Sequence, residues 1–136
     1  MNNLVYPELS YKIIGIAFKV FNDLGYGHQE KYFQRAMALE FDKQGIKYVR
    51  EKEIKLNYDN QCIGKYFLDF FIENKIILEL KVVPKFRYSH LKRTLEYLNE
   101  AKAKLAILIY FTRDGVKYRR IINPKINYNS LIISER

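Results

Sequence analysis

The chain has 136 residues, 49% of them apolar and 15% aromatic, and its 24 Lys and Arg against 15 Asp and Glu give a net charge of +9. This length supports a single domain spanning residues 1–136, and the apolar content excludes a chain that stays disordered. The excess of positive charge attracts polyanions, so nucleic acid is the first class of partner to consider.

The cysteine content and the apolar runs indicate the setting of the protein. The single cysteine, Cys62, excludes an intramolecular disulfide and a Cys-rich zinc site. Residues 1–8 lack the pattern of a secretory signal, and the longest clean apolar run, Leu105 to Phe111, is far shorter than the ~20 residues of a membrane helix. We therefore expect a soluble, intracellular (cytoplasmic) protein with no membrane partner.

Two helices begin the predicted core, which spans about residues 10–123. Apolar residues recur at helical spacing over residues 9–24, and Gly25 offers a C-cap. A second helix is predicted from about His28 to Gln44, because Gly45 follows as a stop signal. The apolar stripe of this second helix consists of Phe33, Met37 and Phe41.

Three strands are predicted next. Residues 47–58 combine apolar and charged positions, and residues 62–72 are rich in aromatics, with a turn at 59–61 between them. A short turn at 73–75 leads to residues 76–83, which are nearly all apolar. Such a run is typical of a central strand that is covered on both faces.

The last predicted elements are a helix and two strands. Ser89 is an N-cap for a helix that ends at about Lys102, and residues 105–111 and 116–122 read as strands, whereas residues 124–136 are assigned no element. The predicted buried stripe of this helix consists of Leu91, Leu95, Leu98 and Ala101. The order α-α-β-β-β-α-β-β predicts an α/β protein (an α+β mixed sheet) with helices on both faces of the sheet.

Several common chemistries are excluded by the motifs. The sequence has no glycine-rich loop for nucleotide phosphates and no dinucleotide-binding fingerprint. With only His28 and His90, a site of three histidine ligands is impossible, and both are predicted to be surface residues.

Acidic residues fall on the predicted apolar strands. Glu79 and Lys81 lie two residues apart in one strand, so they point to the same face. Antiparallel pairing around the 73–75 turn places Asp69 opposite Glu79, where like charges ~4.5–5.5 Å apart are destabilising. Lys81 is one compensating cation, but a divalent metal ion held by two carboxylates and waters is the better geometric answer.

A third acid, Glu30, shares a helical face with the apolar stripe of its helix and is expected to approach the sheet. Each acid also has an ordinary structural explanation. Glu30 would stabilise its helix by ~0.3–1 kcal/mol through its interaction with the helix macrodipole. Asp69 could be an ordinary edge or turn residue, and Glu79 could form a salt bridge with Lys81. A buried cluster of all these charges costs several kcal/mol per uncompensated ion, and this cost favours a functional site.

The spacing of Asp69 and Glu79-Leu80-Lys81 resembles the active-site pattern of the PD-(D/E)XK nuclease superfamily. The segment from Gly25 to Phe33 further resembles the GxxExxY family within that superfamily. The resemblance covers roughly residues 10–123. It implies a restriction-endonuclease-like core and metal-dependent hydrolysis of phosphodiester bonds.

The resemblance also implies roles for single residues. Asp69 and Glu79 match the metal-binding acids, Lys81 matches the catalytic lysine, and Glu30 matches the glutamate of the first core helix. Mg²⁺ or Mn²⁺ is then expected on Asp69, Glu79, the Leu80 carbonyl and Glu30.

Two positions depart from the family pattern. Phe33 replaces the family tyrosine, so a hydroxyl is absent there. Arg93 replaces a glutamine four residues before Tyr97; it either contacts phosphate more strongly or marks a lost metal–water contact.

A basic stretch with interspersed aromatics predicts where nucleic acid binds, although a charge run is also typical of a solvated face. The predicted contacts are Lys85, Arg87, Tyr88, Lys92, Arg93 and Tyr97. A second basic group, consisting of Lys117, Arg119 and Arg120, is a weaker candidate.

The sequence therefore predicts a metal-dependent nuclease that acts on DNA in preference to RNA. The alternatives are a catalytically silent nucleic-acid-binding or accessory domain that retains the fold, and a protein-interaction module. A homodimer is a further prediction, by analogy with the small branched-DNA resolvases of the same superfamily.

Overall fold

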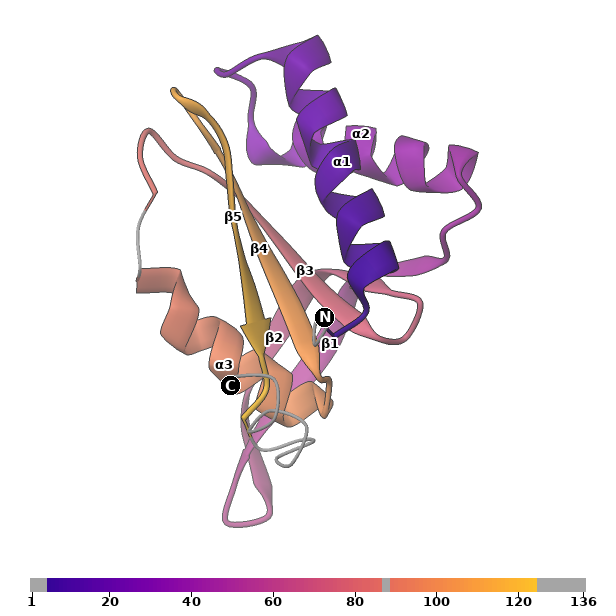
Figure 1. The fold of residues 1–136 in the computed structure, drawn as a ribbon. Helices are drawn as coiled ribbons and strands as arrows, with labels where there is room; N and C mark the ends of the chain where they lie inside the picture. The colour runs from indigo at the N-terminus through magenta and orange to yellow at the C-terminus, as the bar shows by residue number, and fades with distance from the viewer. Residues whose placement is uncertain (1–4, 87–88, 125–136) are drawn as a thin grey trace, which may run out of the picture.

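The computed structural model describes residues 5–86 and 89–124, and the elements lie in the predicted order (Figure 1). They are α1 (Pro7–Leu24), α2 (Glu30–Lys43), β1 (Tyr48–Tyr58), β2 (Gln61–Ile72), β3 (Ile76–Val82), α3 (Ser89–Ala101), β4 (Leu105–Thr112) and β5 (Gly115–Ile122). Gly25 caps α1 with a φ of 76°, as its position predicts. In the described part of the chain, no helix has the length and apolar character of a membrane span. Of the unassigned segment 124–136, only Pro124 lies within the described residues.

The five strands form one mixed sheet in the order β1-β2-β3-β4-β5. Neighbouring strands are antiparallel except β3 and β4, which are parallel and are joined through α3. Every residue of β4 is buried, as are the first five residues of β3. The central position predicted for the third strand is confirmed.

The helices cover both faces of this sheet. The larger core packs α1 and α2 against one face, where the Phe33 ring stacks on Phe111 with centroids 4.2 Å apart. Phe33 is fully buried among apolar side chains, so the missing tyrosine hydroxyl leaves no unsatisfied group there. A smaller core packs α3 against the opposite face. The predicted class, an α+β mixed sheet with helices on both faces, is confirmed.

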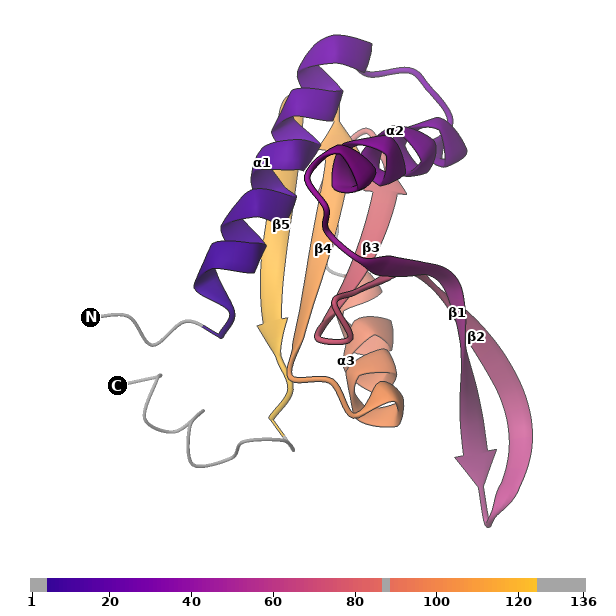
Figure 2. The same cartoon turned by 90° about the vertical axis from the view of Figure 1, so that its right-hand side faces the viewer.

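The hairpin of β1 and β2 leaves the body of the sheet. Residues 70–72 of β2 pair with residues 76–78 of β3, whereas the pairing of β2 with β1 continues to the hairpin turn. Figure 2 shows the two strands projecting past the helices as a two-stranded extension, which we call the arm (residues 52–68). At its base Glu51 has a φ of +51°, which a non-glycine residue adopts only at some cost in strain.

The buried stripe of α3 differs from the prediction. Leu95 is 41% exposed, whereas Tyr97 is only 6% exposed and packs its ring on Tyr66 of the arm, with centroids 5.0 Å apart. The helix therefore buries Thr94, Tyr97 and Leu98, which follow one another at helical spacing. The prediction holds for Leu98, which is fully buried, and is wrong for Leu95 because it counted every leucine as buried.

This stripe predicts unequal effects of two leucine truncations on α3. Leu98→Ala should lower the free energy of unfolding by about 2–5 kcal/mol, because a fully buried side chain leaves a cavity. Leu95→Ala should lower the same free energy by no more than about 1 kcal/mol, because the residue is already 41% exposed and its truncation leaves no closed cavity. Urea denaturation followed by circular dichroism measures both, and equal losses would contradict the observed stripe.

Candidate active site

Asp69 and Glu79 lie where β2 separates from β3, and each carboxylate bonds to the main chain of the other strand. The main-chain N–H of Asp69 donates to Glu79 Oε2 at 2.8 Å. The main-chain N–H of Leu80 donates to Asp69 Oδ2, also at 2.8 Å. The two side chains thus take the place of main-chain ladder bonds just beyond the last regular pair, Phe70 with Leu78.

Burial makes the ionised form of both carboxyls unfavourable. Glu79 is only 5% exposed, and its burial, together with the nearby charge of Asp69, raises its pKa to about 8. Burial also raises the pKa of Asp69, while the Leu80 N–H, Lys81 and Arg50 act in the opposite direction. Two adjacent carboxylates of this kind are deprotonated together most easily when a cation lies between them.

Glu30 approaches the same strands from the first turn of α2. Burial raises its pKa, and the charge of Asp69 adds to that rise. Lys81 and the main chain of Val82 lower it, so the Glu30 carboxyl faces the C-terminal end of β3. The structure therefore brings one helix and two strands, with their acids, to one end of the sheet.

Lys81 is the cation common to this group. It is half-buried on β3, two residues after Glu79, and its charge lowers the pKa of Glu30, Asp69 and Glu79 alike. This is the position that the sequence predicts for a lysine that stabilises negative charge at the site.

The donor set is suited to a hard divalent cation, although two acids rather than three define it. Within residues 5–86 and 89–124, no three His, Cys, Asp or Glu side chains are grouped closely enough to hold one ion. Asp69 and Glu79 each use one oxygen in the hydrogen bonds above, and each has a second carboxylate oxygen, the ligand type that Mg²⁺ and Mn²⁺ prefer. Glu30 and the Leu80 carbonyl remain predicted ligands.

The predicted nucleic-acid contacts fall into three groups. Lys85 follows β3, and Lys92 and Arg93 lie on α3; all three are exposed. Arg87 and Tyr88 lie outside the described residues. Tyr97 is buried under the arm, where burial and the charge of Glu79 raise its pKa, and a ring covered in this way is not available for base stacking.

The second basic group divides between the two faces of β5, as strand alternation requires. The Arg119 guanidinium lies 4.9 Å above the Phe86 ring, whereas half-buried Arg120 donates to the Val5 carbonyl. The two histidines also lie apart. His28 is exposed and contacts the Leu24 carbonyl, and His90 is half-buried with its Nδ1 3.2 Å from the Tyr110 hydroxyl.

Two polar residues near Glu30 were missed by sequence reasoning. Gln34 Nε2 donates to Glu30 Oε2 at 3.3 Å, and the Arg50 guanidinium donates to Gln34 Oε1 at 3.0 Å. The spacing of four residues between Glu30 and Gln34 was available as a signal, because such residues are neighbours on a helix. Nothing in the sequence indicates that Arg50 contacts Gln34, because Arg50 lies sixteen residues after Gln34 and on a strand.

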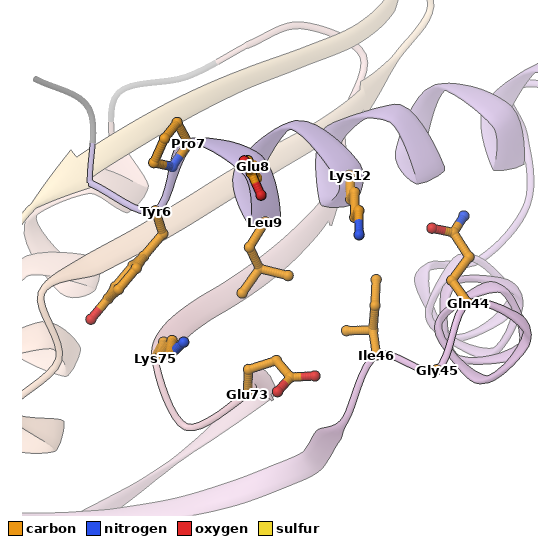
Figure 3. A pocket seen from close by; sticks show the side chains of 10 residues that line it. All are labelled: Tyr6, Pro7, Glu8, Leu9, Lys12, Gln44, Gly45, Ile46, Glu73 and Lys75. Atoms are coloured by element: carbon orange, nitrogen blue, oxygen red, sulfur yellow. The ribbon is translucent and has the colours of Figure 1, made fainter. Parts of the chain in front are cut away.

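A cavity of about 500 Å³ lies away from Asp69 and Glu79, neither of which lines it (Figure 3). It is bounded by the start of α1, the loop before β1 and the turn between β2 and β3. Its charged lining is mixed, with Glu8, Lys12, Glu73 and Lys75, and the Glu73 carboxylate is held by the Lys47 N–H at 2.8 Å. The cavity is thus next to the residues that precede β3, whereas Lys81 lies near the strand's other end.

Comparisons with known proteins identify the superfamily and the fold. A model of the PD-(D/E)XK nuclease superfamily matches residues 7–121, which is most of the chain. The crystal structure of SSO0001 superposes with a TM-score of 0.53 at 18% identity, over 96% of this chain and 63% of that one. The chain thus spans less than two thirds of that protein, and at this identity the likeness shows the fold. Among curated proteins, no match was found.

Proposed function

Because the chain belongs to the PD-(D/E)XK nuclease superfamily, we propose that it is a nuclease that hydrolyses phosphodiester bonds in DNA, in preference to RNA, with Mg²⁺ or Mn²⁺. The observation that supports this proposal is the pair of carboxylates at the point where β2 leaves β3, buried at Glu79 and half-buried at Asp69, with Lys81 beside them. A purely structural pair of this kind would cost several kcal/mol without compensation.

The residues have separate roles in this proposal. Asp69 and Glu79 would hold the ion together with the Leu80 carbonyl. Glu30 would join them as a further ligand on metal binding, because the described residues do not already group three acids around one point. A bound ion supplies polarisation of a phosphoryl oxygen and a more acidic water. Lys81 orients the attacking water and offsets the negative charge that develops on the phosphate.

In this proposal the exposed basic residues bind the phosphates of the nucleic-acid substrate near the site. Lys85, Lys92 and Arg93 lie on the loop after β3 and on α3, close in sequence to the site lysine. Cations at such positions neutralise phosphates, so binding should weaken steeply as salt concentration rises. The net charge of +9 adds a general attraction for the polyanion.

Cleavage of a substrate panel tests the proposal. The purified protein should cleave at least one of linear, nicked, single-stranded or branched DNA with Mg²⁺ or Mn²⁺, and EDTA should stop the reaction. Asp69→Asn should abolish it, because the ion loses a carboxylate. Asp59→Asn is the matched control, since Asp59 lies in the exposed hairpin turn with a φ of 52°, a conformation that Asn also tolerates.

Two outcomes would contradict a nuclease. Salt-sensitive DNA binding without cleavage under any metal would favour the silent nucleic-acid-binding domain. Cleavage that survives both EDTA and Asp69→Asn would point to a contaminant or to another site.

A further inference from the structure

We propose that Gln34 and Arg50 are positioning residues that hold the Glu30 carboxylate in place beside Asp69 and Glu79. The inference rests on the proposed function, because it gives Glu30 a part in that site. It adds two residues outside the predicted catalytic set, and it connects the base of the arm to α2.

Two hydrogen bonds in series support the proposal. Gln34 lies one turn after Glu30 on α2, and its Nε2 donates to Glu30 Oε2 at 3.3 Å. Arg50 crosses from β1 to donate to Gln34 Oε1 at 3.0 Å. All three side chains are half-buried, so water competes less for these bonds than it does at the surface.

The chemistry of the three groups fixes the direction of the chain. A guanidinium only donates, an ionised carboxylate only accepts, and a primary amide has one acceptor oxygen and one donor nitrogen. Arg50 therefore selects the amide orientation in which the Gln34 nitrogen faces Glu30. Without Arg50 the amide can turn over, and its oxygen would then face the carboxylate.

The neutral amide also explains why Arg50 does not bind an acid directly. Within the described residues, Arg50 has no carboxylate within 4 Å, although its charge acts on Asp69. A direct ion pair would occupy carboxylate oxygens that a metal ion needs. Through Gln34, the arginine orients Glu30 without placing its own cation on either oxygen of that carboxylate.

Arg50 itself is held at a defined place. Its guanidinium lies 5.3 Å above the ring of buried Phe70, its partner in the β1–β2 register and the neighbour of Asp69. Its Nε is buried and has no hydrogen-bond partner. A surface arginine would turn to solvate that nitrogen, so the observed position reflects the bond to Gln34 and the contact with Phe70.

Paired substitutions test the proposal, with Gln34→Leu removing the amide and Arg50→Met removing the cation while keeping a long side chain. Each should lower kcat and Mn²⁺ affinity by about 10- to 100-fold, the usual effect of losing a group that orients a metal ligand, with KM changed less than about twofold. In a Glu30→Ala background, neither substitution should reduce kcat or Mn²⁺ affinity further. Lys52→Met is the matched control, because Lys52 is half-buried on the same strand with its ammonium over Phe71 and should change neither quantity.

Additional losses in the Glu30→Ala background would overturn the proposal, because Gln34 and Arg50 would then act independently of Glu30. So would Gln34→Leu with unchanged Mn²⁺ affinity. Circular dichroism spectra check that each variant folds. If Arg50→Met does not fold, Gln34→Leu alone still decides the test.

A readout without cleavage separates this inference from the nuclease proposal. In ¹⁵N spectra of the metal-free protein, the Gln34 side-chain amide signals should shift in both Glu30→Ala and Arg50→Met, and should stay in place in Lys52→Met. Those shifts in a protein that cleaves nothing would contradict the nuclease while supporting the positioning chain. Unshifted signals in an active nuclease would contradict the chain alone.

Discussion

Glu79→Gln should reduce cleavage by about 1,000-fold or more and should at the same time stabilise the metal-free protein. The loss of rate follows because a metal ion contributes several kcal/mol to the transition state, and each 1.4 kcal/mol is tenfold in rate. The gain in stability follows because the amide oxygen still accepts the Asp69 N–H, whereas the Glu79 carboxyl has to take up a proton at pH 7 when folding buries it. With the pKa of Glu79 at about 8, this gain is on the order of 1–3 kcal/mol at pH 7.

Opposite signs for activity and stability distinguish a functional carboxylate from a structural one. Urea denaturation in EDTA measures the free energy of unfolding, and initial rates with Mn²⁺ measure cleavage. Glu53→Gln is the matched control, because Glu53 lies on the arm in an exposed pair with Lys65 and should change the free energy of unfolding by no more than about 1 kcal/mol. If Glu79→Gln destabilised the protein by several kcal/mol, the carboxylate would be a structural one.

The stability of the metal-free protein should fall as pH rises from about 4.5 to about 8. The pKa of Glu79 is raised by folding from 4.5 to about 8, so in this window the folded state holds a proton that the unfolded state has lost. The stabilisation is therefore complete below the unfolded pKa and disappears as pH passes through the folded one. One such group changes the free energy of unfolding by up to about 1.4 kcal/mol per pH unit. The raised pKa values of Asp69 and Glu30 act in the same direction.

Mn²⁺ should reverse this trend, because the ion binds the deprotonated carboxylates. Its apparent affinity should rise with pH up to about 8, and its binding should release protons. Urea denaturation from pH 5 to 9, with and without Mn²⁺, and calorimetry in buffers of different ionisation enthalpy measure the two effects. Glu79→Gln should flatten the metal-free profile. A metal-free protein that became more stable between pH 5 and 8 would show that other groups control this window.

Much of the fold could be predicted because its signals are local. The apolar run of β3 predicted a central strand, and the short turn at residues 73–75 fixed the register that brings Asp69 next to Glu79. The residues brought together at the site were therefore within reach of sequence reasoning, since a strand pair with a short turn has little freedom of register.

The remaining features depend on contacts between distant segments. Regular pairing predicted two side chains facing each other, and it did not predict that each would bond to the main chain of the other strand. The burial of Tyr97 depends on the arm, whose Tyr66 ring covers it. The left-handed φ of Glu51 has no signal in a sequence of Arg, Glu and Lys.

Asp69 and Glu79 lie on two strands that separate from each other at the site, and this separation has a mechanical consequence. Asp69 belongs to β2, which continues into the arm, whereas Glu79 belongs to β3, which continues beside β4. A force that bends the arm toward or away from α3 therefore changes the separation of the two acids together with the packing of the smaller core, to which Ile54 and Leu68 of the arm belong. Any molecule that holds the arm in one position also selects one distance between Asp69 and Glu79.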